Sequence, residues 1–210
     1  MGRLLVVSNR VAVPSRDGGF RAAGGLAVAI RPILKRRPGI WFGWSGRVAA
    51  GSEVMVHTSQ HGRQTYMVTD LTKTEHQEYY NGYANRVLWP ILHYRLDLAE
   101  FCRRDLSGYM RVNQRFASEL HKILQPDDLV WVHDYHLLPL SNTLRDFGHR
   151  NQIGFFHHVP FPPPEILTAL PNHERLISAM SHYDLVGFQT ATDANEFRAV
   201  FADAMWIGEP

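Results

Sequence analysis

Two short runs of β-branched and aromatic residues in the second half of the chain end abruptly in ionisable side chains. The runs begin at Leu129 and Gly154. The ionisable residues at their ends are His133, Asp134, His136, His157 and His158. Buried parallel strands have this composition, and in an open α/β sheet ligands bind beyond the carboxyl ends of the strands. We therefore expect the functional site at this rim of a sheet.

These ionisable residues allow two kinds of chemistry. Asp134 is placed to accept hydrogen bonds from ligand hydroxyl groups and His158 to contact the same ligand, although a histidine bonded only to backbone groups is the alternative. In the second interpretation His133, Asp134 and His136 hold a metal ion, with His157 or His158 completing the set, as in a metal-dependent hydrolase. The sequence has no H-E-x-x-H or comparable spacing here, which argues against a metal site.

Two further anion-binding candidates lie near the N-terminus. Arg10 follows an apolar run that starts at Leu4, and its guanidinium can hold a phosphate bidentately, although an ordinary surface arginine fits the same pattern. Gly24 and Gly25 precede a predicted helix, whose first N–H groups attract phosphate. The pair belongs to neither a G-x-G-x-x-G nor a Walker loop, so a structural turn remains the alternative.

Three aromatic residues are candidates for sugar binding. Trp44 lies in Trp41-Phe-Gly-Trp-Ser-Gly46, Trp89 in Val87-Leu-Trp-Pro90, and Tyr80 follows Tyr79. Flat amphipathic rings suit the apolar faces of sugars, and the indole N–H can donate to an oxyanion. Packing in the core is the alternative for each ring.

The first half of the chain alternates between predicted strands and helices. Residues 4–8 are typical of a buried strand. The following helix is predicted to bury one face, formed by Leu26, Ile30, Ile33 and Leu34. Residues 53–58 and 65–71 alternate as a β-hairpin does, and Thr72-x-x-Glu75 is a capping box that opens a helix through Tyr80.

The second half continues the same alternation. A helix is predicted whose buried face contains Tyr109, Val112, Phe116, Leu120 and Ile123. It is followed by a strand ending at His133, a helix over 139–147, a strand over 152–156, a helix over 174–183, a strand over 184–189 and a helix capped by Thr190. This order predicts an α/β fold with a doubly wound, mainly parallel Rossmann-like sheet and a β-hairpin insertion.

Composition places the chain among ordinary globular proteins. It has 210 residues, 45% hydrophobic and 20% charged, with a formal net charge of +2. That charge gives no indication of a nucleic-acid partner, and no stretch approaches a membrane span. The single cysteine, Cys102, forms no intrachain disulfide, and the apolar run from Leu4 to Val7 is too short for a signal peptide. We therefore expect a cytoplasmic protein.

Nine motifs, in order from Leu4 to about Thr190, together resemble those of trehalose-6-phosphate synthases. They are Ser8-Asn-Arg10, Ala23-Gly-Gly-Leu26, Trp41-Phe-Gly-Trp-Ser-Gly46, Tyr79-Tyr-Asn81, Val87-Leu-Trp-Pro90, His93-Tyr94, Trp131-Val-His-Asp-Tyr-His-Leu-Leu-Pro139, Gly154-Phe-Phe with His158-Val-Pro-Phe-Pro162, and Gly187-Phe-Gln-Thr190. The resemblance implies a retaining glycosyltransferase with two Rossmann-like lobes (GT-B type). Its reaction transfers glucose from UDP-glucose to glucose 6-phosphate and releases UDP and α,α-trehalose 6-phosphate.

The resemblance also implies roles for individual residues. Acceptor binding would fall to Arg10, Trp44, Tyr80, Trp89 and Asp134, with the first four around or near the phosphate and Asp134 on the sugar hydroxyls. The donor diphosphate would be held at Gly24 and Gly25, and His158 would contact the transferred glucose. Asp134 and His158 would then be the catalytic residues, with no metal and no cofactor.

The chain departs from the family pattern at its end. After Thr190 the family continues into a second lobe that binds the nucleotide sugar, whereas this chain ends at Pro210. We therefore expect residues 1–210 to form the N-terminal, acceptor-binding lobe of a truncated chain that self-associates through its exposed cleft. The alternatives are a non-catalytic sugar-phosphate-binding lobe and a metal-dependent hydrolase. A pseudo-glycosyltransferase acting on cyclitols is less well matched, because the tryptophan and tyrosine motifs are intact.

Overall fold

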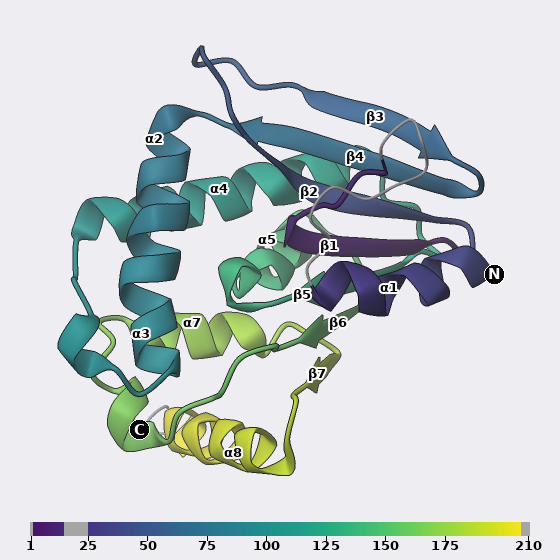
Figure 1. Ribbon diagram of the computed structural model, residues 1–210. Coiled ribbons are helices and arrows are strands. Elements are labelled where there is room, and N and C mark those ends of the chain that lie inside the picture. Colours follow the sequence, from purple (N-terminus) through teal and green to yellow (C-terminus); the bar gives the residue numbers. More distant parts are fainter. Residues whose placement is uncertain (1, 15–24, 207–210) are drawn as a thin grey trace.

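A computed structural model describes residues 2–14 and 25–206. In this part of the chain seven strands form one sheet, in the order β3-β4-β2-β1-β5-β6-β7 (Figure 1). All neighbouring strands are parallel except the antiparallel pair β3 and β4. The strands are β1 (Leu4–Arg10), β2 (Gly39–Val48), β3 (Val56–His61), β4 (Gln64–Leu71), β5 (Leu129–His133), β6 (Gln152–Phe156) and β7 (Leu185–Gly187).

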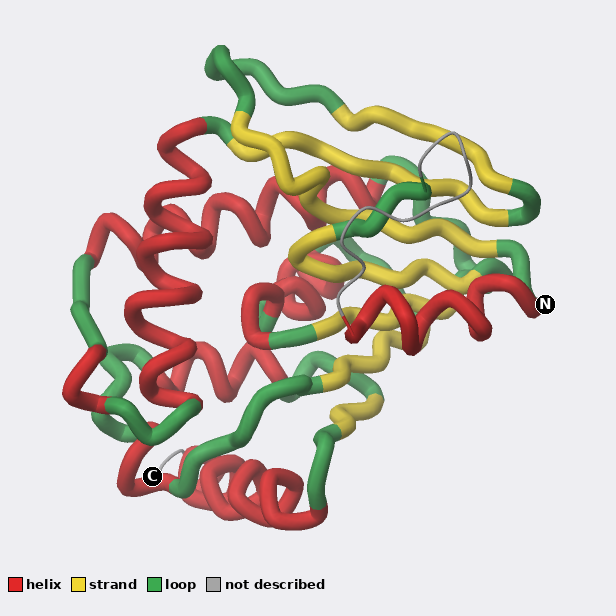
Figure 2. The backbone as a smooth tube through the Cα atoms, viewed as in Figure 1, coloured by secondary structure: helices red, strands yellow, loops and turns green. Residues whose placement is uncertain are grey.

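Helices follow β1, β4, β5, β6 and β7 along the chain and cover both faces of the sheet (Figure 2). The α-helices are α1 (Gly25–Arg36), α2 (Lys73–Glu75), α3 (Trp89–Leu92), α4 (Arg103–His121), α5 (Leu140–Asp146), α6 (Pro164–Leu167), α7 (His173–Met180) and α8 (Ala191–Trp206). A π-helix, η1 (His76–Leu88), joins α2 to α3, and two 3-10 turns are η2 (Leu96–Leu98) and η3 (Tyr135–Leu137). No described helix is long and apolar enough to cross a membrane.

The two faces of the sheet are buried in two separate clusters. Along β1, Leu4 and Val6 pack with Ile30 of α1, whereas Leu5 and Val7 belong to the larger cluster under α4, α5 and α7. Successive residues of a strand point to opposite faces, so a continuously apolar strand such as β1 must be covered on both. The sheet is therefore doubly wound, as predicted.

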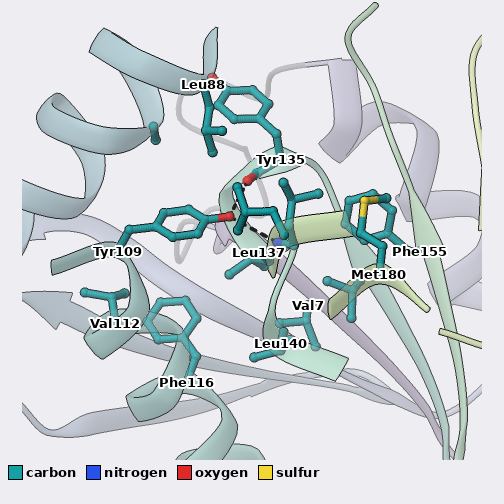
Figure 3. Packing of buried hydrophobic residues seen from close by; sticks show 14 of the residues in the cluster. Val7, Leu88, Tyr109, Val112, Phe116, Tyr135, Leu137, Leu140, Phe155 and Met180 are labelled. Atoms are coloured by element: carbon teal, nitrogen blue, oxygen red, sulfur yellow. Dashed lines mark hydrogen bonds between the residues drawn. The ribbon is translucent and has the colours of Figure 1, made fainter. Parts of the chain in front are cut away.

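The larger cluster contains a buried hydrogen-bonding anchor. The hydroxyl of Tyr109, on α4, donates to the carbonyl of Tyr135 (2.7 Å) and accepts from the N–H of Leu138 (3.2 Å). Figure 3 shows this hydroxyl and its dashed hydrogen bonds among the apolar side chains. Both partners lie in the segment directly after Asp134, so α4 fixes the loop that follows β5.

Several predicted elements are confirmed, with ends shifted by a few residues. The hairpin is present as β3 and β4, and both hydrogen bonds of the Thr72–Glu75 capping box are formed. Thr190 accepts a hydrogen bond from the N–H of Asp193 (3.1 Å) at the start of α8. The predicted buried face of α1 is wrong at Ile33, which is 38% exposed, because α1 packs on the sheet mainly through Ala27, Ile30 and Leu34.

Candidate functional site

The chain reverses its direction across the sheet between β1 and β5. From β1 it crosses to β2 on one side, whereas β5 pairs with β1 on the other side. The carboxyl ends of these two strands border a cavity of about 760 Å³. Open α/β sheets bind ligands at such a topological switch point. The cavity lining includes Asn9, Arg10, Ser45, Gly46, Arg47, His133, Asp134 and His136.

Arg10 is an exposed cation at the rim of this cavity. The pairing of β1 with β2 is irregular between Ser8 and Arg10. The Ser8 hydroxyl accepts from Trp41 Nε1 (2.8 Å) and donates to the Arg10 carbonyl (2.9 Å), which fixes this bulge. Gly46 has φ +86°, and a Cβ there would lie 2.6 Å from Arg10 Nε. No described carboxylate pairs with Arg10, so its guanidinium can bind an anion.

Asp134 has the most unusual backbone of the site. Its φ of 75° and ψ of 162° lie in a region that almost only glycine adopts. Its N–H donates to the Phe156 carbonyl (2.9 Å), while its Oδ1 accepts from the N–H groups of Tyr135 (3.0 Å) and His158 (3.4 Å). The second carboxylate oxygen, Oδ2, has no described partner and is available to a ligand hydroxyl.

His158 and His133 come together at the ends of β6 and β5. His133 Nδ1 lies 2.9 Å from His158 Nε2. Burial and the neighbouring His158 lower the pKa of His133 to about 3, and burial lowers the pKa of His158 against the opposing charge of Asp134. Both rings are therefore neutral at pH 7. His157 is fully buried and its Nε2 meets the Pro160 carbonyl (3.2 Å), so its place is in the core.

His136 contributes to the site in a way that the sequence did not indicate. It lines the cavity, and neither of its ring nitrogens has a partner among the described residues. Its ring stacks on Tyr135 (4.1 Å between centroids) and on Tyr80 (5.9 Å), and burial lowers its pKa to about 4. Tyr80 thus belongs to an aromatic stack that borders the cavity.

The two tryptophans do not line the cavity. Trp44 is buried, packs on Tyr80 (5.1 Å between centroids) and donates its Nε1–H to the Arg47 carbonyl (2.7 Å). Its N–H is therefore already used, and its ring supports Tyr80. Trp89 is 40% exposed and stacks on His93 (4.1 Å). It lies beyond the C-terminal end of η1, and its ring is available to a ligand there.

The glycine pair is only partly visible. Gly24 lies outside the described residues, and Gly25 is the first residue of α1. A Cβ at Gly25 would meet no described atom within 4 Å. Space alone therefore does not require glycine at position 25, and binding of a diphosphate there remains a prediction.

Four polar residues of the cavity lining were missed by sequence reasoning: Ser8, Asn9, Ser45 and Arg47. Asn9 accepts from the Tyr79 hydroxyl (2.8 Å), and Ser45 donates to Asp70 (2.5 Å), which also pairs with Arg47. These residues lie close together because β1, β2 and β4 pair in parallel, and no local pattern in the sequence predicts that pairing. Among the described residues, no three His, Cys, Asp or Glu side chains form a group that could hold a metal.

Comparisons with known proteins show to which family this chain is similar. The family model for glycosyltransferase family 20 matches residues 2–205. The trehalose-6-phosphate synthase of Sinorhizobium fredii is 52% identical over 199 residues, which cover 94% of this chain and 43% of that protein. The enzyme of the same name from Enterobacter sp. is 49% identical over 197 residues, covering 94% of this chain and 41% of that protein.

Solved structures give the same result. A UDP-forming α,α-trehalose-phosphate synthase from Burkholderia xenovorans, in complex with glucose-6-phosphate, superposes with a TM-score of 0.89 at 44% identity, covering 96% of this chain and 44% of that one. An E. coli structure with bound UDP-2-fluoro glucose also gives 0.89, at 46% identity, covering 96% and 43%. The chain thus spans less than half the length of these relatives. With residues 2–205 matched, the chain belongs to glycosyltransferase family 20.

Proposed function

We propose that this chain supplies the acceptor-binding lobe of a glycosyltransferase that makes α,α-trehalose 6-phosphate. The enzyme would transfer glucose from UDP-glucose to glucose 6-phosphate with retention and release UDP. Relatives carrying the name of this enzyme, and related structures holding glucose-6-phosphate and a fluorinated UDP-glucose, support the proposal. A second lobe, expected from the family resemblance, would bind the nucleotide. No cofactor or metal is part of the proposal.

One observation carries the proposal: a cation that pairs with no described carboxylate and the carboxylate of a second residue face the same cavity. Arg10 and Asp134 both line it, from adjacent strand ends. A guanidinium recognises a phosphate, and a carboxylate recognises sugar hydroxyls. A sugar phosphate carries both a phosphate and hydroxyl groups. Tyr80 and Trp89 would complete the phosphate side, and Trp44 would hold Tyr80 in place.

The proposed mechanism relies on positioning rather than on a protein nucleophile. The acceptor hydroxyl would attack the anomeric carbon as the bond to UDP breaks, and the departing diphosphate would take the hydroxyl proton. Catalysis then comes from alignment of the two substrates and from stabilisation of the charge on the leaving diphosphate. Asp134 would orient the acceptor, His158 would contact the transferred glucose, and Gly24 and Gly25 would allow close approach of the diphosphate.

Two further properties are proposed from the chain as a whole. Its composition and single cysteine suit a cytoplasmic enzyme. Exposed apolar side chains, among them Phe101 and Leu185, suit formation of a homo-oligomer. Size-exclusion chromatography with light scattering would test the oligomer, and a monomer at high concentration would contradict it.

Calorimetric titration of the 210-residue chain tests the acceptor site. We expect glucose 6-phosphate to bind, and Arg10→Ala to weaken it about 10- to 100-fold, because a charge-assisted hydrogen bond contributes about 1.5–3 kcal/mol. Arg63→Ala is the matched control, since Arg63 is exposed in the hairpin turn at the opposite end of the sheet. Titration with glucose, which lacks the phosphate, should distinguish the two variants. Asp134→Asn should weaken the binding of both glucose and glucose 6-phosphate, whereas Arg10→Ala should weaken only the binding of glucose 6-phosphate.

UDP release from UDP-glucose, with and without glucose 6-phosphate, tests the reaction. Release that depends on glucose 6-phosphate supports the glycosyltransferase. Binding of glucose 6-phosphate without release, by the folded chain, identifies it as a sugar-phosphate-binding lobe that needs a nucleotide-binding partner. Failure of the folded chain to bind glucose 6-phosphate at millimolar concentration would contradict the acceptor site itself.

A further inference from the structure

His133 is a buried histidine at the carboxyl end of a strand. It is the last residue of β5 and only 1% exposed. Its Nδ1 faces His158 Nε2 at 2.9 Å, whereas its Nε2 is buried and has no partner among the described residues. The ring also packs on Trp131, with 4.4 Å between centroids. A buried polar atom without a partner costs free energy, so this arrangement requires an explanation.

The hydrogen bond between the two rings allows two tautomeric arrangements. If His158 donated, His133 would carry its proton on Nε2, and a buried N–H would lack an acceptor. If His133 donates from Nδ1, only a lone pair is left without a partner. Buried donors without acceptors are the rarer and less tolerated case in proteins. Burial therefore favours donation by His133.

The surroundings of His158 favour the same arrangement. When its Nε2 accepts from His133, the ring of His158 carries its proton on Nδ1, the nitrogen nearer the main chain. The main-chain N–H of this residue lies 3.4 Å from Asp134 Oδ1, and the negative charge of that carboxylate favours a proton nearby. Nδ1 of His158 has no described partner, so its N–H is left for a ligand.

We propose that His133 is a positioning residue that donates its Nδ1–H to His158 Nε2 and so fixes His158 as an Nδ1–H donor. The consequence of this arrangement rests on the proposed function: the neutral Nδ1–H of His158 would be directed at an oxygen of the transferred sugar. The second nitrogen of an active histidine commonly sets its tautomer in this way. In this chain the setting residue comes from the neighbouring strand.

The state of the pair should not depend on pH over the physiological range. Burial and His158 hold the pKa of His133 near 3, so His133 stays neutral well below pH 5. Among the described residues, the charged groups near the pair are Asp134, whose charge favours protonation of His158, and Arg10 and Arg47, which line the same cavity.

Nitrogen-15 NMR of the 210-residue chain, labelled at histidine, tests the tautomers without any need for activity. The signals are assigned by their loss in His133→Phe and His158→Phe. We expect pyrrole-like shifts for Nδ1 of both rings and pyridine-like shifts for both Nε2 atoms between pH 7 and pH 8, where both rings are neutral. A pyrrole-like Nε2 on His133 would overturn the proposal, whether or not the chain proves to be a glycosyltransferase.

Steady-state kinetics test whether His133 affects the reaction through His158. They require a polypeptide that contains this sequence and releases UDP. His133→Phe keeps the ring but cannot hydrogen-bond, and we expect kcat to fall about 100-fold, because misplacement of a reacting group by about 1 Å has that effect. KM for glucose 6-phosphate should stay within about threefold. His133→Asn carries an amide nitrogen at the position of Nδ1 and should restore most of kcat. An unchanged kcat in a folded His133→Phe variant would overturn the positioning role.

Discussion

Gly46 provides the sharpest test of how the site is built. Its φ of +86° is unfavourable for any residue with a Cβ, and a Cβ at this position would lie 2.6 Å from Nε and 2.9 Å from the central carbon of the Arg10 guanidinium. The guanidinium is the end of a flexible side chain, so it can move away. Gly46→Ala should therefore still fold, but Arg10 should leave the position from which we propose that it binds phosphate.

Two separate magnitudes follow from this geometry. An L-residue in the left-handed region costs about 1–2 kcal/mol, so Gly46→Ala should lower the free energy of unfolding by that amount. Displacement of Arg10 removes a charge-assisted contact that contributes about 1.5–3 kcal/mol, which weakens glucose 6-phosphate binding about 10- to 100-fold. For a chain of this size, 1 kcal/mol corresponds to a shift in Tm of about 2–4 °C.

The assay combines thermal denaturation with calorimetric titration, and Gly148→Ala is the matched control. Gly148 has φ +85°, but a Cβ there would meet no described atom within 4 Å. Both variants should lose similar stability, whereas only Gly46→Ala should lose affinity for glucose 6-phosphate. Equal affinities of the two variants would refute the argument that Gly46 holds Arg10 in its binding position.

Three further predictions concern stability. Asp128 is buried, and although burial raises its pKa, hydrogen bonds from Arg3 outweigh this and lower it. The stabilisation that the Asp128 carboxylate contributes is therefore complete above about pH 4 and is lost as pH falls through the lowered pKa. Asp128→Asn should lower the free energy of unfolding in urea by about 1.5–3 kcal/mol at pH 7 and make it less dependent on pH in acid. Tyr109→Phe removes the hydrogen bond to the buried carbonyl of Tyr135 and leaves that carbonyl without its donor. This should lower the free energy of unfolding in urea by about 1–3 kcal/mol. Asp134→Gly should be about 1–3 kcal/mol more stable than Asp134→Ala, because only glycine relieves the strained φ and ψ, while neither binds glucose 6-phosphate.

Local patterns in the sequence were sufficient for the elements whose ends are determined by nearby residues. The Thr72–Glu75 box predicted a helix start because both of its hydrogen bonds lie within four residues. The hairpin was predicted because alternating strands flanked a short polar turn, and β5 because its apolar run ends at His133. Since parallel strands all present their carboxyl ends at one rim, the general location of the site followed from these elements.

Features that depend on contacts between distant segments could not be predicted in this way. The strand β2 contains Trp41 and Trp44, and their spacing alone did not show that one N–H is bound to Ser8 and the other to the Arg47 carbonyl. The π-helix η1 was expected only as an α-helix through Tyr80, because propensity does not distinguish the two helix types. Likewise, a helical pattern cannot tell which flank of α1 the sheet leaves uncovered at Ile33.

The candidate site coincides with three departures from regular backbone at neighbouring strand ends. The pairing of β1 with β2 is irregular between Ser8 and Arg10, and Gly46 in β2 has a positive φ. Asp134, directly after β5, has φ and ψ values that glycine usually adopts. A strand that continued regularly would send alternate side chains into the two covered faces of the sheet. Each departure instead turns the chain at the rim, so that Arg10 and Asp134 reach the cavity. Strain of this kind persists only where surrounding hydrogen bonds hold it, and those of Ser8 and of Phe156, Tyr135 and His158 do so here. The backbone conformation that costs stability is thus the one that brings a cation and a carboxylate into one cavity.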